Sequence, residues 1–397
     1  MTRLHRLCAG VFAGLLLGAA ALAGGDATGR IEYLGNPLKQ KYAEKEAIFA
    51  RNVWDMQLFD GRIFLGGGNS SNDGPAANAG PLPIIAYDLG TRRFVTEGTV
   101  YDEQIDIYKP IDGALFIPGN DATGSWKRGN FYERTPEGKW QMYRNIPDAL
   151  HVYDLSKRGK TLFAGIGLYE GAAVGMTDDM GEHWKIVPLG DSRVYAFMTI
   201  DDTLLALKKF KNTSRPYFSA AQYLDGGTFS ARFDIGMQTI FPDTRFTQTY
   251  ARATRILPVG KAVLYTGGYK YGSHHTLPFG LYSASMRNGR FAARRIPLPE
   301  GTLPRDLLAR GDRLYLLTQQ AQKGADRVAV WSASAENLLE WKNLFYFTYP
   351  TFARSFEYDG RSFYFGMGCD ADMRRPGGGA LPEQTGDVLK VTYEGKE

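Results

Sequence analysis

A histidine and a tyrosine two residues apart are placed to transfer protons. His151 and Tyr153 stand at the start of a strand-like run, and side chains two residues apart on a strand lie on the same side. An imidazole can remove a proton and a phenol can donate one, so the pair could abstract a proton beside a carboxylate that an arginine neutralises. We therefore name His151 and Tyr153 as candidate catalytic residues. The alternative is that His151 is an ordinary hydrogen-bonded histidine.

Four arginines stand at the starts of other strand-like runs. They are Arg193, Arg252, Arg305 and Arg354. A guanidinium binds carboxylate or sulfate through paired N–H donors, so these residues are candidates for binding an anionic ligand. They lie 9, 8, 7 and 6 residues before the next tight turn, and regular alternation along a strand would not point all of them the same way. The alternative for each arginine is an ion pair with an aspartate between neighbouring sheets.

Further polar residues complete the candidate ligand-binding set. Asp106 begins a strand-like run, Asn120 and Asp121 lie in one loop, and His274 and His275 lie in another. Two adjacent histidines on a strand point to opposite faces, and the sequence offers them no recognisable third metal ligand. We therefore predict ligand binding at these five residues, with no metal and no cofactor.

A repeated hairpin indicates how the chain could gather these residues. An apolar run, a tight turn rich in Asp and Gly, and a second apolar run recur seven times, with the second turn residue at 61, 113, 159, 202, 260, 312 and 360. A second pair of strand-like runs follows each hairpin, and no helical period of 3.6 is convincing. Four short strands in each of seven units predict an all-β fold, a seven-bladed β-propeller.

The predicted single domain covers residues 24–397. Its blades span approximately 50–104, 105–149, 150–192, 193–249, 250–301, 302–351 and 352–397. The last blade is one strand short, and the strand-like run from Arg30 to Leu34 could supply the missing outer strand from segment 28–36. Such a closure would also cover the exposed edge of an open array.

The propeller topology separates short turns from long loops. Turns between the first and second strands and between the third and fourth strands of every blade share one face. The other face receives the starts of the innermost strands and the long loops 66–81, 119–129, 208–217, 267–280 and 366–386. Long loops on a rigid scaffold commonly carry binding residues, so we expect the site on this long-loop face.

One segment carries a family resemblance. Thr177 to Trp184 resembles the Asp-box of sialidase-like propellers with BNR repeats, whose pattern is Ser or Thr, any, Asp, any, Gly, any, any, Trp. Ser334 to Trp341 and Glu133 to Trp140 keep parts of the pattern. The resemblance implies a turn between the third and fourth strands of a blade, in which Asp179 binds backbone donors and Trp184 packs between strands. It implies a structural role for these residues and identifies no individual family.

The N-terminus has the features of a secretory leader. Arg3 and Arg6 precede the apolar run from Leu7 to Leu22, and small residues end at Ala23, so residues 1–23 are predicted to be a signal peptide cleaved near Ala23. No later stretch is apolar for the length of a membrane span, and we expect a secreted or periplasmic protein. Loss of the leader lowers the formal charge from +5 to about +3, which is too small to indicate a nucleic-acid partner. Cys369 is then left without a disulfide partner.

Two function classes remain open. The first is a propeller that binds an acidic oligo- or polysaccharide on the long-loop face and could cleave it as a polysaccharide lyase or a glycoside hydrolase. Propeller lyases that act on uronic acids resemble this chain in architecture only. The second is a non-catalytic scaffold that holds a protein partner across the same face.

Overall fold

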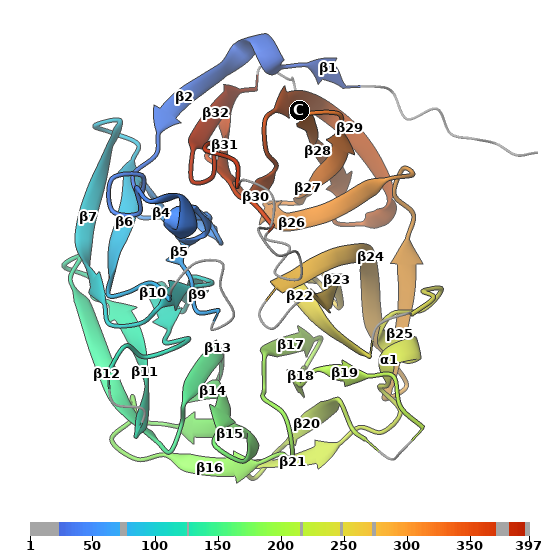
Figure 1. The fold of residues 1–397 in the computed structure, drawn as a ribbon. Coiled ribbons are helices and arrows are strands. Elements are labelled where there is room, and N and C mark those ends of the chain that lie inside the picture. The colour runs from blue at the N-terminus through green and yellow to red at the C-terminus, as the bar shows by residue number, and fades with distance from the viewer. Residues whose placement is uncertain are drawn as a thin grey trace, which may run out of the picture.

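The computed structural model describes residues 24–71, 78–124, 127–214, 217–246, 249–271, 275–370 and 381–393. Of residues 270, 271, 275 and 276 only the backbone is described. Seven antiparallel sheets of four main strands surround a common centre (Figure 1), and the predicted seven-bladed β-propeller is confirmed. The predicted leader lies outside the described residues. Within the described ranges, no helix is both long and apolar enough to cross a membrane.

Each blade runs from an inner strand to an outer strand. Blade 1 contains β3 (Met56–Phe59), β4 (Arg62–Leu65), β6 (Leu82–Asp88) and β7 (Arg93–Val100). Blade 2 contains β9 (Lys109–Ile111), β10 (Ala114–Pro118), β11 (Arg128–Arg134) and β12 (Trp140–Pro147). Blade 3 contains β13 (His151–Arg158), β14 (Thr161–Leu168), β15 (Gly171–Thr177) and β16 (Lys185–Pro188). Blade 4 contains β17 (Ala196–Ile200), β18 (Thr203–Leu207), β20 (Ala220–Leu224) and β21 (Thr228–Ala231).

The remaining blades complete the ring. Blade 5 contains β22 (Tyr250–Val259), β23 (Ala262–Tyr271), β24 (His275–Arg287) and β25 (Arg290–Ile296). Blade 6 contains β26 (Thr302–Arg310), β27 (Arg313–Gln322), β28 (Ala325–Ser334) and β29 (Asn337–Tyr349). Blade 7 contains β30 (Ala353–Tyr358), β31 (Ser362–Met367), β32 (Val388–Thr392) and β2 (Ile31–Gly35). The short elements outside this plan are β1 (Gly25–Asp26), β5 (Gly67–Gly68), β8 (Gln104–Ile105), β19 (Phe210–Lys211), the 3₁₀ helices η1 (Thr28–Arg30) and η2 (Lys45–Arg51), and α1 (Met237–Ile240).

Local turn chemistry explains the hairpins. Asp60 and Gly61 have φ values of 49° and 69°, and Asp112 and Gly113 have φ values of 49° and 79°. Positive φ at both central residues is the signature of a type I′ turn, whose twist suits a two-residue hairpin. Asp and Gly tolerate this left-handed conformation, so these dipeptides fix the inner hairpins of blades 1 and 2.

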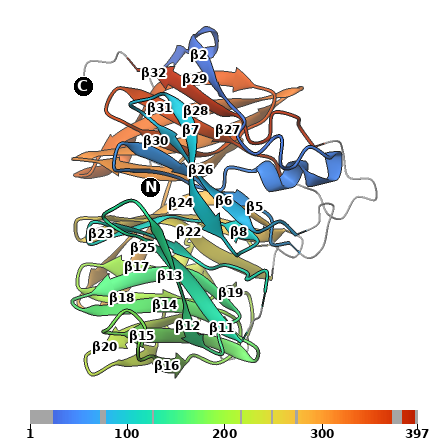
Figure 2. The ribbon, with the colours of Figure 1, turned by 90° about the vertical axis from the view of Figure 1, so that its left-hand side faces the viewer.

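The N-terminal strand closes the last blade, as the sequence predicts. β2 pairs antiparallel with β32, from Ile31 opposite Val391 to Gly35 opposite Val388. β1 runs parallel to β29 of blade 6, so the same segment contacts two blades (Figure 1), and Figure 2 shows β2 next to β32. The Asn36 side chain then donates to the Thr385 carbonyl at 2.9 Å. The ring is thus joined by main-chain hydrogen bonds between its two ends.

Apolar clusters between neighbouring blades form the core. One such cluster joins Phe163 and Val174 of blade 3 to Phe197 and Leu204 of blade 4, and all four side chains are buried. Full burial of an aliphatic or aromatic side chain stabilises a fold by about 1.5–3 kcal/mol. The burial of these apolar side chains between the sheets therefore holds neighbouring blades together.

Acidic side chains on inner strands add a second connection between blades. Each of four carboxylates accepts a hydrogen bond from a backbone N–H of the following blade, and blade 7 connects to blade 1 in this way. Charge-assisted bonds of this kind are stronger than neutral ones. The pairs are Asp55 with Tyr108, Asp154 with Phe197, Asp306 with Phe356, and Glu357 with Leu58, at 2.7–3.1 Å.

The segment from Thr177 to Trp184 forms a turn between β15 and β16. The Gly181 N–H donates to Thr177 Oγ1 at 2.8 Å, and the His183 N–H donates to Asp179 Oδ1 at 3.0 Å. Trp184 Nε1 donates to Asn145 Oδ1 of blade 2 at 3.1 Å. These bonds fix the turn and anchor it to the neighbouring blade.

Candidate functional site

A cavity of about 620 Å³ lies at the centre of the ring, and residues from all seven blades line it. We call it the central cavity. Nine of the residues that the sequence singles out line it together, namely Asp106, Asn120, Asp121, His151, Tyr153, Arg193, Arg252, Arg305 and Arg354. His274 lies outside the described residues, and of His275, the first residue of β24, only the backbone is described. Pro278 of the same strand does line the cavity.

Bulges in the inner strands turn several of these side chains toward the cavity. The pairing of β13 with β14 skips Tyr153, that of β26 with β27 skips Arg305, and that of β30 with β31 skips Arg354. A bulge inserts an extra residue, bends the strand and changes the direction of a side chain. The expectation from regular alternation, that the four arginines could not share one direction, is therefore wrong, because the inner strands are not regular.

The neighbours of His151 determine which of its two ring nitrogens carries the proton. Its Nδ1 lies 2.9 Å from the Asn120 carbonyl oxygen and 3.6 Å from Asp121 Oδ1. A carbonyl oxygen only accepts hydrogen bonds, so Nδ1 carries the proton. In the neutral ring the lone pair then resides on Nε2, which makes Nε2 the basic atom.

Tyr153, Tyr195 and Arg252 follow one another in space beside His151. The Tyr153 ring lies 5.4 Å from the His151 ring and 4.7 Å from the Tyr195 ring, measured between centroids. The guanidinium carbon of Arg252 lies 3.5 Å from the Tyr195 ring centroid, a cation–π distance. Burial, and then the neighbouring Tyr195, raise the pKa of Tyr153 above its ordinary value, and Arg252 and Arg193 oppose this only in part. The Tyr153 phenol is therefore protonated at neutral pH and can act as a proton donor.

Blade 2 supplies an acidic wall to the central cavity, formed by Asp106 and Asp121. Asp106 Oδ2 accepts a bond from Asn120 Nδ2 at 3.1 Å, and Gln104 donates to Asp106 Oδ1. Burial raises the pKa of both carboxyls. That of Asp121 reaches about 7, because burial is reinforced by the nearby charge of Glu103. Asp121 can therefore exchange a proton near neutral pH.

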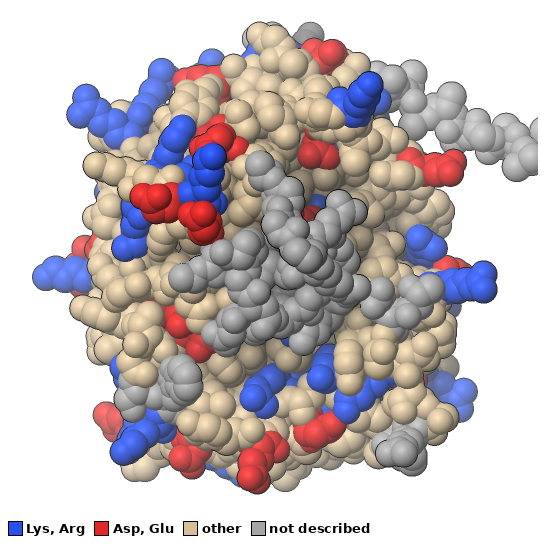
Figure 3. All heavy atoms as spheres, viewed as in Figure 1, with Lys and Arg blue, Asp and Glu red and all other residues tan. Residues whose placement is uncertain are grey.

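The opposite side is a basic wall, formed by Arg193, Lys209 and Arg252. Within the described ranges, neither arginine of this wall forms a salt bridge. Arg193 Nη1 donates to the Ser192 carbonyl at 3.0 Å. Burial, followed by the charges of neighbouring basic groups, lowers the pKa of Lys209. Figure 3 shows Lys and Arg side chains gathered on this face in the region of β17 to β19.

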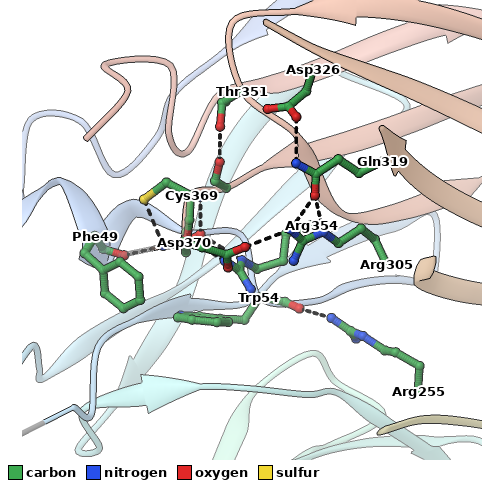
Figure 4. Close-up of polar contacts among 12 residues, drawn as sticks. Phe49, Trp54, Arg255, Arg305, Gln319, Asp326, Thr351, Arg354, Cys369 and Asp370 are labelled. Atoms are coloured by element: carbon green, nitrogen blue, oxygen red, sulfur yellow. Dashed lines mark hydrogen bonds and ion pairs between the residues drawn. The ribbon is translucent and has the colours of Figure 1, made fainter. Parts of the chain in front are cut away.

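Arg255 also lines the cavity, and no pattern in the sequence pointed to it. Its Nη1 lies 2.9 Å from Asp55 Oδ1 of blade 1, and its Nε lies 3.4 Å from Asp306 Oδ1 of blade 6. Figure 4 shows the side chain reaching the Trp54 carbonyl. Arg255 has a φ of 48° and lies in the irregular stretch of β22 between Thr254 and Leu257. This strand irregularity, which has no sequence signature, sends the side chain across the channel.

Arg305 and Arg354 differ from the basic wall because both bind a carboxylate of the chain. Arg305 Nη2 lies 2.7 Å from Asp370 Oδ2, and Arg354 Nη2 lies 2.8 Å from Asp370 Oδ1 (Figure 4). The alternative raised for the four arginines, an ion pair with an aspartate between neighbouring sheets, thus holds for Arg305, whereas Arg354 pairs with an aspartate of its own blade. It does not hold for Arg193 and Arg252 among the described residues.

The chain is similar to known proteins in its fold and not in its sequence. No protein-family model matches the sequence, and no curated protein matches it. The polysaccharide lyase Uly1 is similar at 9% identity and a TM-score of 0.46, over 87% of this chain and 90% of that one. The β-propeller domain of the Trilobed protease from Pyrococcus furiosus is similar at 12% identity and a TM-score of 0.45, over 86% and 92%. An auxiliary nutrient binding protein from Bacteroides ovatus is similar at 12% identity and a TM-score of 0.41, over 86% and 69%. At these values the likenesses assign no function to the chain.

Proposed function

We propose that the central cavity binds an anionic carbohydrate. The observation that carries the proposal is the basic wall, where Arg193 and Arg252 line the cavity without a carboxylate partner among the described residues. Buried or half-buried guanidinium groups are stabilised by an anion, and a carboxylate or sulfate matches their paired donors. The cavity volume of about 620 Å³ is typical of small-molecule sites. The Tyr153 and Tyr195 rings beside the arginines offer flat apolar surface for a sugar ring.

The arrangement next to the basic wall supports cleavage by elimination. In this proposal Nε2 of His151 removes the proton from the carbon beside the sugar carboxylate, whose charge Arg252 or Arg193 neutralises. The electron pair of that C–H bond forms a C=C double bond, and the glycosidic C–O bond breaks. The Tyr153 phenol gives its proton to the leaving oxygen, and no water is consumed. The 5.4 Å spacing of the two rings places the base and the acid side by side.

Hydrolysis fits the cavity less well than elimination. A glycoside hydrolase of the usual kind needs two carboxyl groups that flank the scissile bond. Asp106 and Asp121 both belong to the acidic wall, so they approach a ligand from the same side. The His151 and Tyr153 pair lies between the two walls, which favours proton transfer without an attacking water.

Docking of a protein partner would call for a contiguous apolar patch. The exposed large apolar side chains among the described residues are instead spread over blades 2, 3, 4, 6 and 7 and the crossing after β7. They are Tyr33, Tyr101, Met142, Tyr169, Leu224, Phe233 and Leu339. The proposal therefore rests on the central cavity.

Replacing Arg252 should weaken the binding of a uronic-acid oligosaccharide. We expect Arg252→Gln to raise the Kd for oligogalacturonate or oligoguluronate about tenfold or more, because a charge-assisted contact is lost. Isothermal titration calorimetry at fixed ionic strength would measure the change. Arg290→Gln is the matched control, because Arg290 is an exposed arginine of the β24–β25 hairpin in the same blade. Equal affinity of both variants and the intact protein would contradict the proposal.

Replacing His151 should remove turnover but leave binding. A panel of uronic-acid polysaccharides would be screened by the ultraviolet absorbance of the unsaturated product, with the intact protein, His151→Ala and Tyr153→Phe. We expect product from the intact protein and at least a hundredfold less from either variant, because base and acid are both needed. Absence of product from the intact protein on every polymer would overturn the elimination chemistry, and the Arg252 titrations would still test the binding.

A further inference from the structure

We propose that Arg305 and Arg354 form a second anion subsite of the central cavity, which the chain's own Asp370 carboxylate fills and which a carboxylate of the ligand can take over. The inference rests on the proposed function and extends it. It specifies the expected ligand further, as an oligosaccharide with acid groups on more than one residue.

The two arginines bind the Asp370 carboxylate in the way in which they would bind the carboxylate of a ligand. Each of its oxygens accepts an N–H from a different arginine, at 2.7 Å from Arg305 and at 2.8 Å from Arg354 (Figure 4). Two guanidinium groups that share one carboxylate form a charge-assisted clamp. Nothing in this geometry depends on the carboxylate being part of the same chain.

Arg305 is fixed by contacts other than Asp370. Its Nε donates to Gln319 Oε1 at 2.7 Å, and the Gln319 amide donates in turn to Asp326 at 2.6 Å. The guanidinium carbon lies 3.7 Å from the centroid of the Phe352 ring. This arginine would therefore keep its position if Asp370 left.

Arg354 is fixed in the same manner on the other side. Its Nε donates to Asn52 Oδ1 at 2.8 Å, and its Nη2 donates to the Cys369 carbonyl at 2.5 Å. The guanidinium carbon lies 4.4 Å from the Trp54 ring centroid (Figure 4). The two donors of the subsite are thus preorganised on two blades, which lowers the cost of binding an anion.

Exposure differs between the carboxylate and its partners. The side chains of Arg305 and Arg354 are 4% and 9% exposed, whereas that of Asp370 is 23% exposed. Both arginines line the central cavity. Burial alone would raise the pKa of Asp370, but the two arginines outweigh it and lower that pKa to about 2. Two buried cations side by side require an anion, and Asp370 covers them from the more accessible side.

The test is a charge-matched pair of variants titrated with digalacturonate and trigalacturonate. Asp370→Asn should bind these oligomers about tenfold more tightly than the intact protein, because the ligand no longer competes with Asp370. Asp191→Asn removes a like charge beside Ser192 and Arg193 of the same cavity, because Lys211 and Lys208 outweigh burial and keep the pKa of Asp191 low, so it reports the general electrostatic gain. A further Arg305→Gln substitution in the Asp370→Asn background should abolish the extra affinity. The proposal is wrong if the gain of Asp370→Asn does not exceed that of Asp191→Asn, or if it survives Arg305→Gln.

A second measurement separates this inference from the proposed function. Asp370→Ala should be less stable than the intact protein, and sodium acetate should raise its melting temperature more than sodium chloride at equal ionic strength. The intact protein should show no such difference between the two salts. An acetate-specific effect without any oligouronate binding would retain the anion subsite and reject the carbohydrate ligand. Oligouronate binding that depends on Arg252, together with equal effects of the two salts on Asp370→Ala, would reject the subsite and retain the proposed function.

Discussion

Replacing Arg255 by methionine should lower the free energy of unfolding by about 3–5 kcal/mol at pH 8, because removal of one partner leaves buried charges uncompensated. Arg255 connects blade 5 to Asp55 of blade 1 and to Asp306 of blade 6 through the centre of the ring. All three side chains are largely buried. Methionine keeps an unbranched, flexible apolar side chain and carries no charge, so the change tests the charge more than the packing.

The loss should depend on pH in a defined direction. Burial raises the pKa of Asp55 and of Asp306, the latter to about 7, and Arg255 opposes this effect. A carboxyl whose folded pKa exceeds its unfolded pKa loses stabilisation as the pH rises through the folded value. Without Arg255 both pKa values rise further. The destabilisation by Arg255→Met should therefore be larger at pH 8 than at pH 5, where both carboxyls bind protons in the variant.

Urea unfolding at pH 5 and pH 8 would measure this difference. Lys160→Met is the control, because Lys160 forms an exposed pair with Asp178 at 3.1 Å, and exposed pairs contribute little. We expect the control to unfold as the intact protein does at both values of pH. An equal loss for Arg255→Met at pH 5 and pH 8 would show that Arg255 acts through packing and not through its charge.

Deleting residues 24–36 should lower the melting temperature by about 10 °C or more, since several kcal/mol of stability are lost from a domain of this size. The deletion removes β2, which pairs with β32, and β1, which pairs with β29. It also removes Asn36, whose side chain contacts Asp387 at 3.0 Å. β32 would become an exposed edge strand, and such edges promote association between chains.

Thermal unfolding followed by circular dichroism, with light scattering in parallel, would measure both effects of the deletion. Asn36→Ala is the graded control, because it removes the side-chain contacts and keeps the strand. We expect a shift of only a few degrees for this variant, as for the loss of one or two hydrogen bonds. A deletion that shifts the transition no more than Asn36→Ala would mean that the ring does not depend on this closure.

The sequence by itself determined the number of blades and the face on which the candidate residues meet. Turn dipeptides such as Asp60-Gly61 act locally, because their left-handed backbone sets the hairpin whatever the rest of the chain does. Once the repeat is recognised, topology brings the starts of all inner strands to one face. For this reason residues as distant as Asp106 and Arg354 could be assigned to one site in advance.

Only the tertiary structure determined which of these charged side chains form ion pairs within the described part of the chain. Bulges at Tyr153, Arg305 and Arg354 depend on the pairing of whole strands, and no short pattern in the sequence encodes them. The crossing of the channel by Arg255 depends in the same way on blades far apart in the sequence. The ion pair of Arg305 with Asp370 likewise joins two blades, so charge balance in the cavity is a property of the packed blades.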